Sequence, residues 1–449
     1  MNRQENSTYT VFLETYGCQM NVYDTSAMHG ILDRDGFRRT ADLTEADVIL
    51  LNTCSVREHA EHRVMSRVGE LRNRLAKHTD RRVIIGICGC MAERLGEELI
   101  ANGSKVDLAV GVDQYDLLPS MLFQLLNGID RQKSAAVGHR SDVHYVAPPE
   151  AYPQNNSHLV TIHKGCDYRC TYCIVPETRG PQREKSPDVI LSEIQRVVAS
   201  GGEEITLLGQ NVTAYHWEGT LNFAGLLRQA ARLDGIKRIR FLTGHPRDMT
   251  DELLHTIAAE SKVCPALHVP LQSGSDRILR RMKRLHDRDE YLTMVQKAKT
   301  WIPEVTFSSD FIVGFPGESE RDFRDTLEVL RTVEYDQVFS FKYSERPGTP
   351  AARLADDVPL VEKKHRLAKL MAVQQEVWFK IASAQIGQSW RGIVEDRARR
   401  PENAWRMRTA NNRKVLLQNA DVAVGDEVEA RIVGFEHSTF KGEPLTNSR

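Results

Sequence analysis

The sequence Lys-Gly-Cys-Asp-Tyr-Arg-Cys-Thr-Tyr-Cys, residues 164–173, holds three of the chain's eight cysteines at the spacing C-x3-C-x2-C. Directly upstream, residues 158–163 are rich in branched side chains, which predicts a strand that ends just before a loop. The paired C-x2-C knuckles of a zinc site are missing, and no fourth ligand follows at zinc spacing. Three thiolates on one loop therefore favour an iron–sulfur cubane that keeps one iron open.

An open iron can hold a substrate atom, whereas a closed four-thiolate cluster only moves electrons. The same distinction separates catalytic from structural metal sites. Zinc, or cysteines that merely pack in a core, are the alternatives, but three cysteines this close rarely lack a joint role. The loop is therefore predicted to be the catalytic centre.

This stretch resembles the signature of the radical S-adenosylmethionine (SAM) enzymes. In that family the loop holds a [4Fe–4S] cluster, and SAM chelates the open iron through its amino and carboxylate groups. The resemblance implies that Cys166, Cys170 and Cys173 are the ligands, and that Tyr172 lies beside the adenine of SAM.

Length and composition describe a multidomain protein. The 449 residues predict two to four domains, because a single core seldom grows past roughly 250–300 residues, and 41% hydrophobic content suffices for packed cores. A net charge of −1 restricts nucleic-acid contacts to local patches. No apolar run reaches the roughly 18 residues of a membrane span, and residues 1–10 are too polar for a signal peptide, so we expect a cytoplasmic protein without membrane contacts. Cysteines in such a protein favour metal or catalytic thiols over disulfides.

The first segment alternates strand-like and helix-like stretches, which predicts an open parallel α/β sheet with crossover helices. The expected strands are residues 9–16, 48–51, 83–87 and 106–112. Cysteines follow three of them: Cys18, Cys54, and the pair Cys88 and Cys90. The intervals from 18 to 54 and from 54 to 90 are 36 residues each, about one βαβ unit.

Parallel strands one unit apart end at the same edge of a sheet, where open α/β folds build their sites. Three thiols distant in sequence should therefore converge there. Taken singly, each cysteine is more often a small buried hydrophobe, but together they predict a second cluster. Cys88 and Cys90 compete for one position, and the residues alone leave that choice open.

Residues 127–156 carry glycines and prolines with little periodicity, which predicts a linker. Downstream, six strands alternate with helices, which predicts a partial (β/α)6 barrel, open enough at its carboxyl ends to admit a bulky second substrate. The expected strands are residues 158–163, 204–208, 238–242, 267–271, 305–313 and 338–343, and the expected helices are 188–200, 223–233, 250–260, 291–300 and 320–332.

Polar residues at the ends of these strands are candidates for binding SAM. Amides and hydroxyls suit its ribose and methionine groups, and a glycine permits close approach. Ordinary turn chemistry and helix capping explain the same residues equally well, with Ser275 as an example of an N-cap. His245 and Cys264 are taken as structural. The candidates are Gln210, Asn211, Gln272, Ser273 and Gly314.

The last part of the chain changes character after a long periodic stretch, residues 360–386, that predicts a bridging helix. Short strands from Gly387 onward predict a small β-barrel. Seven basic residues face one acidic residue between positions 397 and 414, a pattern that suits RNA or, equally, a solvated surface. The barrel resembles an RNA-binding TRAM domain, which favours RNA. The candidates are Arg399, Arg400, Trp405, Arg406, Arg408, Arg413 and Lys414.

Nearly the whole chain resembles the radical SAM methylthiotransferases, most closely the MiaB-type branch that acts on tRNA. The resemblance implies three domains, residues 8–130, 152–386 and 387–449. In that family the third cluster ligand of the first domain is a cysteine followed by Met or Val and then by Ala. This pattern selects Cys90 as the ligand that joins Cys18 and Cys54, and Cys88 is the alternative. The motifs that carry the resemblance are Tyr-Gly-Cys-Gln-Met-Asn at 16–21, Leu-Asn-Thr-Cys-Ser-Val-Arg at 51–57, Gly-Cys-Met-Ala-Glu at 89–93, Leu-Leu-Gly-Gln-Asn-Val at 207–212, Gln-Ser-Gly-Ser-Asp-Arg-Ile-Leu at 272–279 and Arg-Thr-Ala-Asn-Asn-Arg at 408–413.

This resemblance implies methylthiolation of carbon 2 of an N6-isopentenyladenosine at position 37 of tRNA. It also implies two [4Fe–4S] clusters, SAM as radical source and methyl donor, an electron donor such as flavodoxin or ferredoxin, and a sulfur source. Relatives act on a threonylcarbamoyl adenosine or on an aspartate of a ribosomal protein. A non-catalytic iron–sulfur RNA-binding redox sensor is the alternative from another class. No acid–base pair is expected, because an aromatic C–H bond has no acidic proton to remove.

Overall fold

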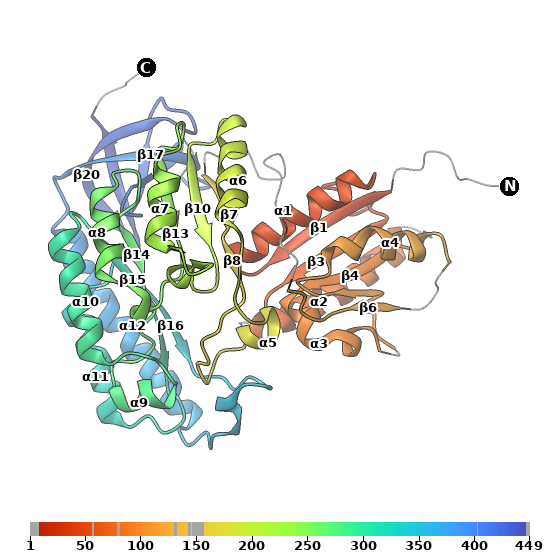
Figure 1. Cartoon of the computed structure of the whole chain (residues 1–449), viewed down its shortest axis with the longest axis horizontal. Coiled ribbons are helices and arrows are strands. Elements are labelled where there is room, and N and C mark those ends of the chain that lie inside the picture. The colour runs from red at the N-terminus through yellow and green to blue at the C-terminus, as the bar shows by residue number, and fades with distance from the viewer. Residues whose placement is uncertain are drawn as a thin grey trace. The chain divides into compact units, whose positions relative to one another are not determined.

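The computed structural model describes residues 9–55, 58–78, 81–101, 103–129, 133–141, 145, 157–401 and 403–445 (Figure 1). The chain divides into two compact units. The first comprises Met1–Pro153, Leu159–Tyr168 and Cys173–Lys185, and the second comprises Gln154–His158, Arg169–Tyr172 and Ser186–Arg449. The first unit is therefore larger than the predicted domain 8–130, and the second contains the predicted small barrel.

The first unit is built on a six-stranded parallel sheet of order β2-β1-β3-β4-β5-β6, which confirms the predicted parallel α/β architecture. Its strands are β1 (Thr10–Tyr16), β2 (Arg38–Arg39), β3 (Val48–Thr53), β4 (Ile84–Gly89), β5 (Leu108–Val110) and β6 (Ser134–Ala136). Its helices are α1 (Gln19–Arg34), α2 (Glu58–His78), α3 (Cys90–Ile100), α4 (Leu118–Leu126) and α5 (Val175–Arg179).

The edge strands of this sheet, β2 and β6, are too short to leave a periodic pattern in the sequence. β6 lies inside the stretch predicted to be a linker, so that prediction is wrong for Ser134–Ala136. Three small residues suffice there because β6 is held by backbone pairing to β5. Backbone hydrogen bonds do not depend on side-chain type, which is why the sequence pattern missed the strand.

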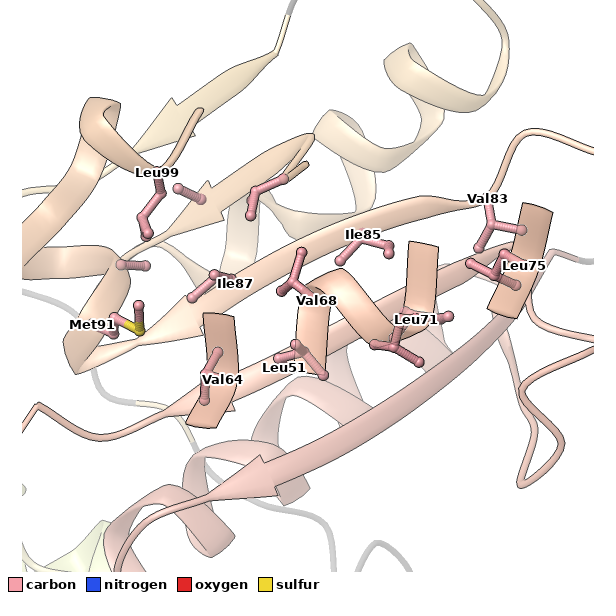
Figure 2. Packing of buried hydrophobic residues seen from close by; sticks show 14 of the residues in the cluster. Leu51, Val64, Val68, Leu71, Leu75, Val83, Ile85, Ile87, Met91 and Leu99 are labelled. Carbon is pink, nitrogen blue, oxygen red and sulfur yellow. The ribbon is translucent and has the colours of Figure 1, made fainter. Parts of the chain in front are cut away.

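One hydrophobic core of the first unit lies between the sheet and α2, with residues of α3 added to it. Every residue of β3 and β4 is buried, as expected for parallel strands that are covered on both faces. Figure 2 shows α2 laying a row of apolar side chains along the strands. The row has helical spacing, so one stripe of α2 is buried. Its members are Val64, Val68, Leu71 and Leu75.

The predicted partial barrel is present. Its strands form two groups, ordered β13-β10-β7 and β14-β15-β16. An isolated parallel bridge between Ile239 and Val263 joins the end strand of one group to the chain that leads into the other. The strands are β7 (Ser157–Thr161), β10 (Glu204–Leu208), β13 (Arg238–Phe241), β14 (Ala266–His268), β15 (Thr306–Val313) and β16 (Gln337–Lys342). All six predicted strands are present.

Helices follow these strands as the periodicity predicts. The five expected helices are α6 (Pro187–Ala199), α7 (Phe223–Ala231), α8 (Asp251–Ala259), α10 (Arg288–Trp301) and α11 (Glu320–Val333), and the unpredicted short α9 spans Asp276–Arg281. The predicted bridging helix is α12 (Leu360–Ser383). No helix among the described residues is long and apolar enough to cross a membrane.

The predicted small β-barrel is present and closed, with strand order β17-β18-β19-β21-β20. Its core centres on Phe440, against which the rings of Trp378 and Trp390 pack edge-on. Trp378 belongs to α12, so the bridging helix also covers one end of the barrel. The strands are β17 (Ser389–Arg397), β18 (Ala404–Thr409), β19 (Lys414–Gln418), β20 (Glu427–Glu436) and β21 (Thr439–Pro444).

The turn between β18 and β19 docks on the amino ends of the barrel strands β10, β13 and β15. Buried Arg240 donates to the carbonyls of Thr409 and Ala410, each at 2.9 Å, and to Glu204 at 2.9 Å. Thr306 Oγ1 donates to the carbonyl of Asn411 at 2.7 Å. The small barrel is thus fixed at the end of the strands opposite to their carboxyl ends.

Replacing Arg240 by Ala should loosen this docking, because Glu204 and two carbonyls would lose a buried partner. We expect a loss of about 3–5 kcal/mol in the free energy of unfolding of the small barrel. Tryptophan fluorescence during urea unfolding measures it, since Trp378, Trp390 and Trp405 report on this region. Arg391→Ala is the control, because Arg391 is 70% exposed and its pair with Glu429 should contribute less than about 1 kcal/mol. Equal urea midpoints of unfolding for the Arg240→Ala and Arg391→Ala variants would contradict the docking role of Arg240.

Candidate iron–sulfur and substrate site

Three cysteines of the first unit lie at the carboxyl edge of its sheet because the strands are paired in parallel register. Tyr16 of β1 pairs with Thr53 of β3, and Thr53 pairs with Gly89 of β4. Cys54 and Cys90 directly follow paired residues and so occupy equivalent positions. The residue after Tyr16 is Gly17, so Cys18 lies one residue farther along and caps α1.

The ends of two helices point at this edge. Cys18 is the N-cap of α1, and Cys90 is the first residue of α3. The N-terminus of a helix carries unpaired N–H groups and partial positive charge, which favours thiolate over thiol. Cys18 is exposed, whereas Cys54 and Cys90 are buried. Cys18 is therefore the accessible thiol of this edge.

A buried amide network supports the cysteines from behind. Asn21 Oδ1 accepts from the Cys18 sulfur at 3.5 Å, and Asn21 Nδ2 donates to the Thr53 carbonyl at 3.2 Å. Asn52 Nδ2 donates to the Asn21 carbonyl at 2.7 Å, which ties α1 to β3. Gly89 has a φ of +90°, and a Cβ there would lie 2.7 Å from the Thr53 carbonyl oxygen. Only glycine fits directly before Cys90.

The surroundings distinguish Cys90 from Cys88. Burial raises the pKa of the Cys90 thiol. The nearby charge of Cys18 also raises it, whereas Arg179, which interacts with the Cys90 thiol, lowers it. Burial also raises the pKa of Cys88, and burial is the cause of that rise. Cys88 belongs to β4 itself. Arg179 was not singled out in the sequence, where no pattern relates it to these thiols.

Within the described part of the chain, no three His, Cys, Asp or Glu side chains lie close enough to share one metal ion.

The C-x3-C-x2-C loop contributes residues to both units. In the first unit Cys166 and Cys173 are half-buried. The turn before Cys166 needs glycine, since Gly165 has a φ of +74° and a Cβ would lie 1.9 Å from the Pro181 carbonyl oxygen. In the second unit Cys170 is buried, and Arg284 Nη1 donates to its sulfur at 3.5 Å. A charged donor therefore contacts this sulfur.

Gln210 and Gln272 are each set apart by one feature of this structure. The Oε1 atom of Gln210 has no hydrogen-bond partner among the described residues. Gln272 has a φ of +77° at the end of its strand, which is unusual for a residue other than glycine and is typical of functional positions. Tyr172 is half-buried against the apolar cluster that includes Phe315 and Tyr343.

The other three strand-end candidates have structural partners. Asn211 Nδ2 donates to Asp248 at 2.6 Å. Ser273 Oγ lies 3.5 Å from Thr326 Oγ1. Gly314 donates its N–H to Glu318 at 2.8 Å. A Cβ added at Gly314 would clash with the side chain of Lys363 on α12. Ser275 takes the predicted N-cap position of α9, but its hydroxyl donates to Asp322 at 2.5 Å instead of capping the helix.

The predicted basic strip on the small barrel divides into two classes. Three of its arginines form ion pairs within the protein, Arg406 with Asp396, Arg408 with Glu395 and Arg413 with Asp336. Arg399, Arg400 and Lys414 are exposed, and Trp405 is half-buried with Arg397 over its ring. Counting charges between positions 397 and 414 missed the acidic partners, because they lie outside that window.

Comparison with known proteins covers both cysteine sites. The uncharacterized protein family UPF0004 matches residues 10–111, and the radical SAM superfamily matches residues 160–330. The tRNA-2-methylthio-N(6)-dimethylallyladenosine synthase of Christiangramia forsetii is 37% identical over 98% of this chain and 94% of its own length. The synthase of Chloroherpeton thalassium is 40% identical over 98% of this chain and 97% of its own length.

The chain belongs to this synthase family. As a radical SAM protein it uses a [4Fe–4S] cluster and SAM. A solved structure of the radical SAM methyltransferase TsrM from Kitasatospora setae, with cobalamin and a [4Fe–4S] cluster bound, superimposes with a TM-score of 0.57 at 13% identity, covering 77% of each chain. That likeness shows that the two chains share a fold.

Cys18 should be the most reactive thiol of the cluster-free protein. Hydrogen bonding from Cys54 lowers its pKa to about 6, and Cys18 is exposed. Because the thiolate is the nucleophile, its alkylation by iodoacetamide should rise with pH through about 6, well below the range of an ordinary thiol. Peptide mass spectrometry across pH measures this rate. Cys88, buried and with a raised pKa, is the internal control and should stay unlabelled. A midpoint near 8.5 for Cys18 would contradict the described surroundings.

Proposed function

We propose that this protein methylthiolates carbon 2 of N6-isopentenyladenosine at position 37 of tRNA. The observation that carries the proposal is a second three-thiol set, built from Cys18, Cys54 and Cys90, in addition to the C-x3-C-x2-C loop. One set suffices for a radical enzyme that only abstracts hydrogen. A separate thiol set supports a reaction that must also deliver sulfur. The relatives' names supply the substrate.

Acid–base residues cannot open the aromatic C–H bond of the substrate, because it has no acidic proton and no leaving group. A [4Fe–4S] cluster at Cys166, Cys170 and Cys173 with SAM would supply a 5′-deoxyadenosyl radical, and a second cluster at Cys18, Cys54 and Cys90 would supply sulfur. The helix N-termini of α1 and α3 stabilise the thiolates of Cys18 and Cys90. Gln210 and Gln272 are proposed to hold SAM through their amides.

The exposed part of the basic strip is proposed to contact tRNA phosphates. Arg399, Arg400 and Lys414 are exposed to solvent, whereas Arg406, Arg408 and Arg413 form ion pairs within the protein. Trp405 offers part of a ring face for stacking. An electron donor such as flavodoxin or ferredoxin and a sulfur source complete the set of proposed partners.

SAM cleavage separates the proposed enzyme from a redox sensor that uses the same cysteines. Reconstituted protein with dithionite should release 5′-deoxyadenosine, and Cys166→Ala should abolish that release, because two thiolates do not hold a site-differentiated cluster. Chromatography of the products measures it. The buried Cys264, which lies in neither thiol set, is replaced by Ala as the control. Normal release from Cys166→Ala would overturn the assignment of the loop.

The choice between Cys90 and Cys88 is tested on tRNA that carries isopentenyladenosine. Cys90→Ala should stop formation of the methylthio product while SAM cleavage continues, because the radical site has its own ligands. Cys88→Ala should leave both reactions intact. Nucleoside mass spectrometry with assay of 5′-deoxyadenosine measures both. Loss of product in Cys88→Ala with full product in Cys90→Ala would transfer the ligand role to Cys88.

Exposed charge on the small barrel should set the salt dependence of tRNA binding. Replacing Arg399 and Arg400 by Glu should weaken binding and reduce the slope of log K against log salt by roughly one for each phosphate that the protein no longer neutralises. Fluorescence anisotropy across salt concentrations measures the slope. Arg324→Glu on α11, where the exposed Arg324 pairs with Glu320, is the matched control. An unchanged slope in the double variant would show that this surface is only solvated.

A further inference from the structure

Arg179 is a buried cation beside the thiols of the first unit. It is the last residue of α5, and its side chain is only 4% exposed. Its Nη2 atom donates to Asp24 Oδ2 at 2.7 Å, and Asp24, on α1, is 1% exposed. α5 packs against α3, the helix that begins with Cys90. The guanidinium is therefore held between the two helices whose N-termini carry Cys18 and Cys90.

Nη2 is the atom of this guanidinium that donates to the Asp24 carboxylate. Nη1 is buried without a well-formed hydrogen bond among the described residues. The same guanidinium interacts with the thiol of Cys90, and its charge acts in the direction that favours thiolate at Cys18 as well. A buried, unsatisfied donor on a cation is costly. An anion at the thiol edge would remove that cost.

A purely structural ion pair is the simpler explanation for Arg179 and Asp24. Such a pair would need no unsatisfied donor and no proximity to thiols, and a buried pair on its own adds little stability compared with apolar packing. A three-thiolate iron–sulfur cluster, in contrast, is anionic, and its reduction potential depends on net charge and on hydrogen bonds to its sulfurs. Arg179 can affect the reduction potential in both ways, because it brings a positive charge and a hydrogen-bond donor to the thiols.

We propose that Arg179 is a positioning residue of the auxiliary site, one that compensates the negative charge of a cluster at Cys18, Cys54 and Cys90 and raises its reduction potential. Asp24 fixes the guanidinium and limits its effective charge. This inference rests on the proposed function, since it requires the second cluster. The two members of the pair should act with opposite signs: loss of Arg179 lowers the potential, and loss of the Asp24 charge raises it.

The experiment uses the full chain with Cys166, Cys170 and Cys173 replaced by Ala, so that only the auxiliary cluster remains. Iron is counted after reconstitution, and the midpoint potential is read from a redox titration followed by electron paramagnetic resonance. Arg179→Gln should shift the potential to more negative values, Asp24→Asn to more positive values, and Arg179→Lys should lie close to the parent. Arg72→Gln is the control, because Arg72 forms a partly buried pair with Asp107 in the same unit and should leave the potential unchanged.

The outcomes separate the role of Arg179 from the existence of the auxiliary cluster. Shifts of opposite sign for Arg179→Gln and Asp24→Asn, with no shift for Arg72→Gln, support the inference. If Arg179→Gln fails to retain iron, Asp24→Asn decides alone, and an unchanged potential in that variant overturns the inference. An unchanged potential in both variants, with normal iron, overturns it while the auxiliary cluster stands. A parent chain that binds no iron overturns the auxiliary cluster itself, and the role of Arg179 with it.

Discussion

The parallel register of β1, β3 and β4 is the constraint on which the first unit depends. The backbone ladder aligns Tyr16, Thr53 and Gly89, so the chain leaves three neighbouring strands at one edge. Each exit carries a cysteine within two residues. A slip of one residue in any strand would turn its buried side chains to the opposite face and move its thiol. The burial of every residue in β3 and β4 makes such a slip costly, so packing and site geometry are set together.

Electrostatics at that edge follows from the same topology. In a parallel α/β sheet each strand is followed by a helix whose N-terminus faces the carboxyl edge, so α1 and α3 direct partial positive charge at Cys18 and Cys90. Asn21 and Asn52 satisfy the backbone groups behind the thiols without adding charge. Arg179 adds a full positive charge from α5. Neutral amides therefore lie behind the thiols, and one buried cation lies beside them.

Long periodic segments could be predicted from the sequence, and features that depend on tertiary partners could not. The six barrel strands and α12 are where hydrophobic patterns placed them, because burial imposes the pattern directly. β6 was missed because backbone pairing alone defines it. Arg408 and Arg413 are candidates for RNA contacts by sequence, but the fold pairs them with Glu395 and Asp336. The equal spacing of the cysteines hid the one-residue offset of Cys18, which only the strand register reveals.

Nucleoside analysis of tRNA from cells that lack the gene tests the central claim most directly. Liquid chromatography with mass spectrometry should show that 2-methylthio-N6-isopentenyladenosine disappears, that unmodified N6-isopentenyladenosine accumulates, and that a plasmid copy of the wild-type gene restores the product. A plasmid copy with Cys18→Ala should not restore it. Unchanged 2-methylthio-N6-isopentenyladenosine in the deletion strain, or selective loss of a methylthiolated threonylcarbamoyl adenosine, would contradict the proposed function.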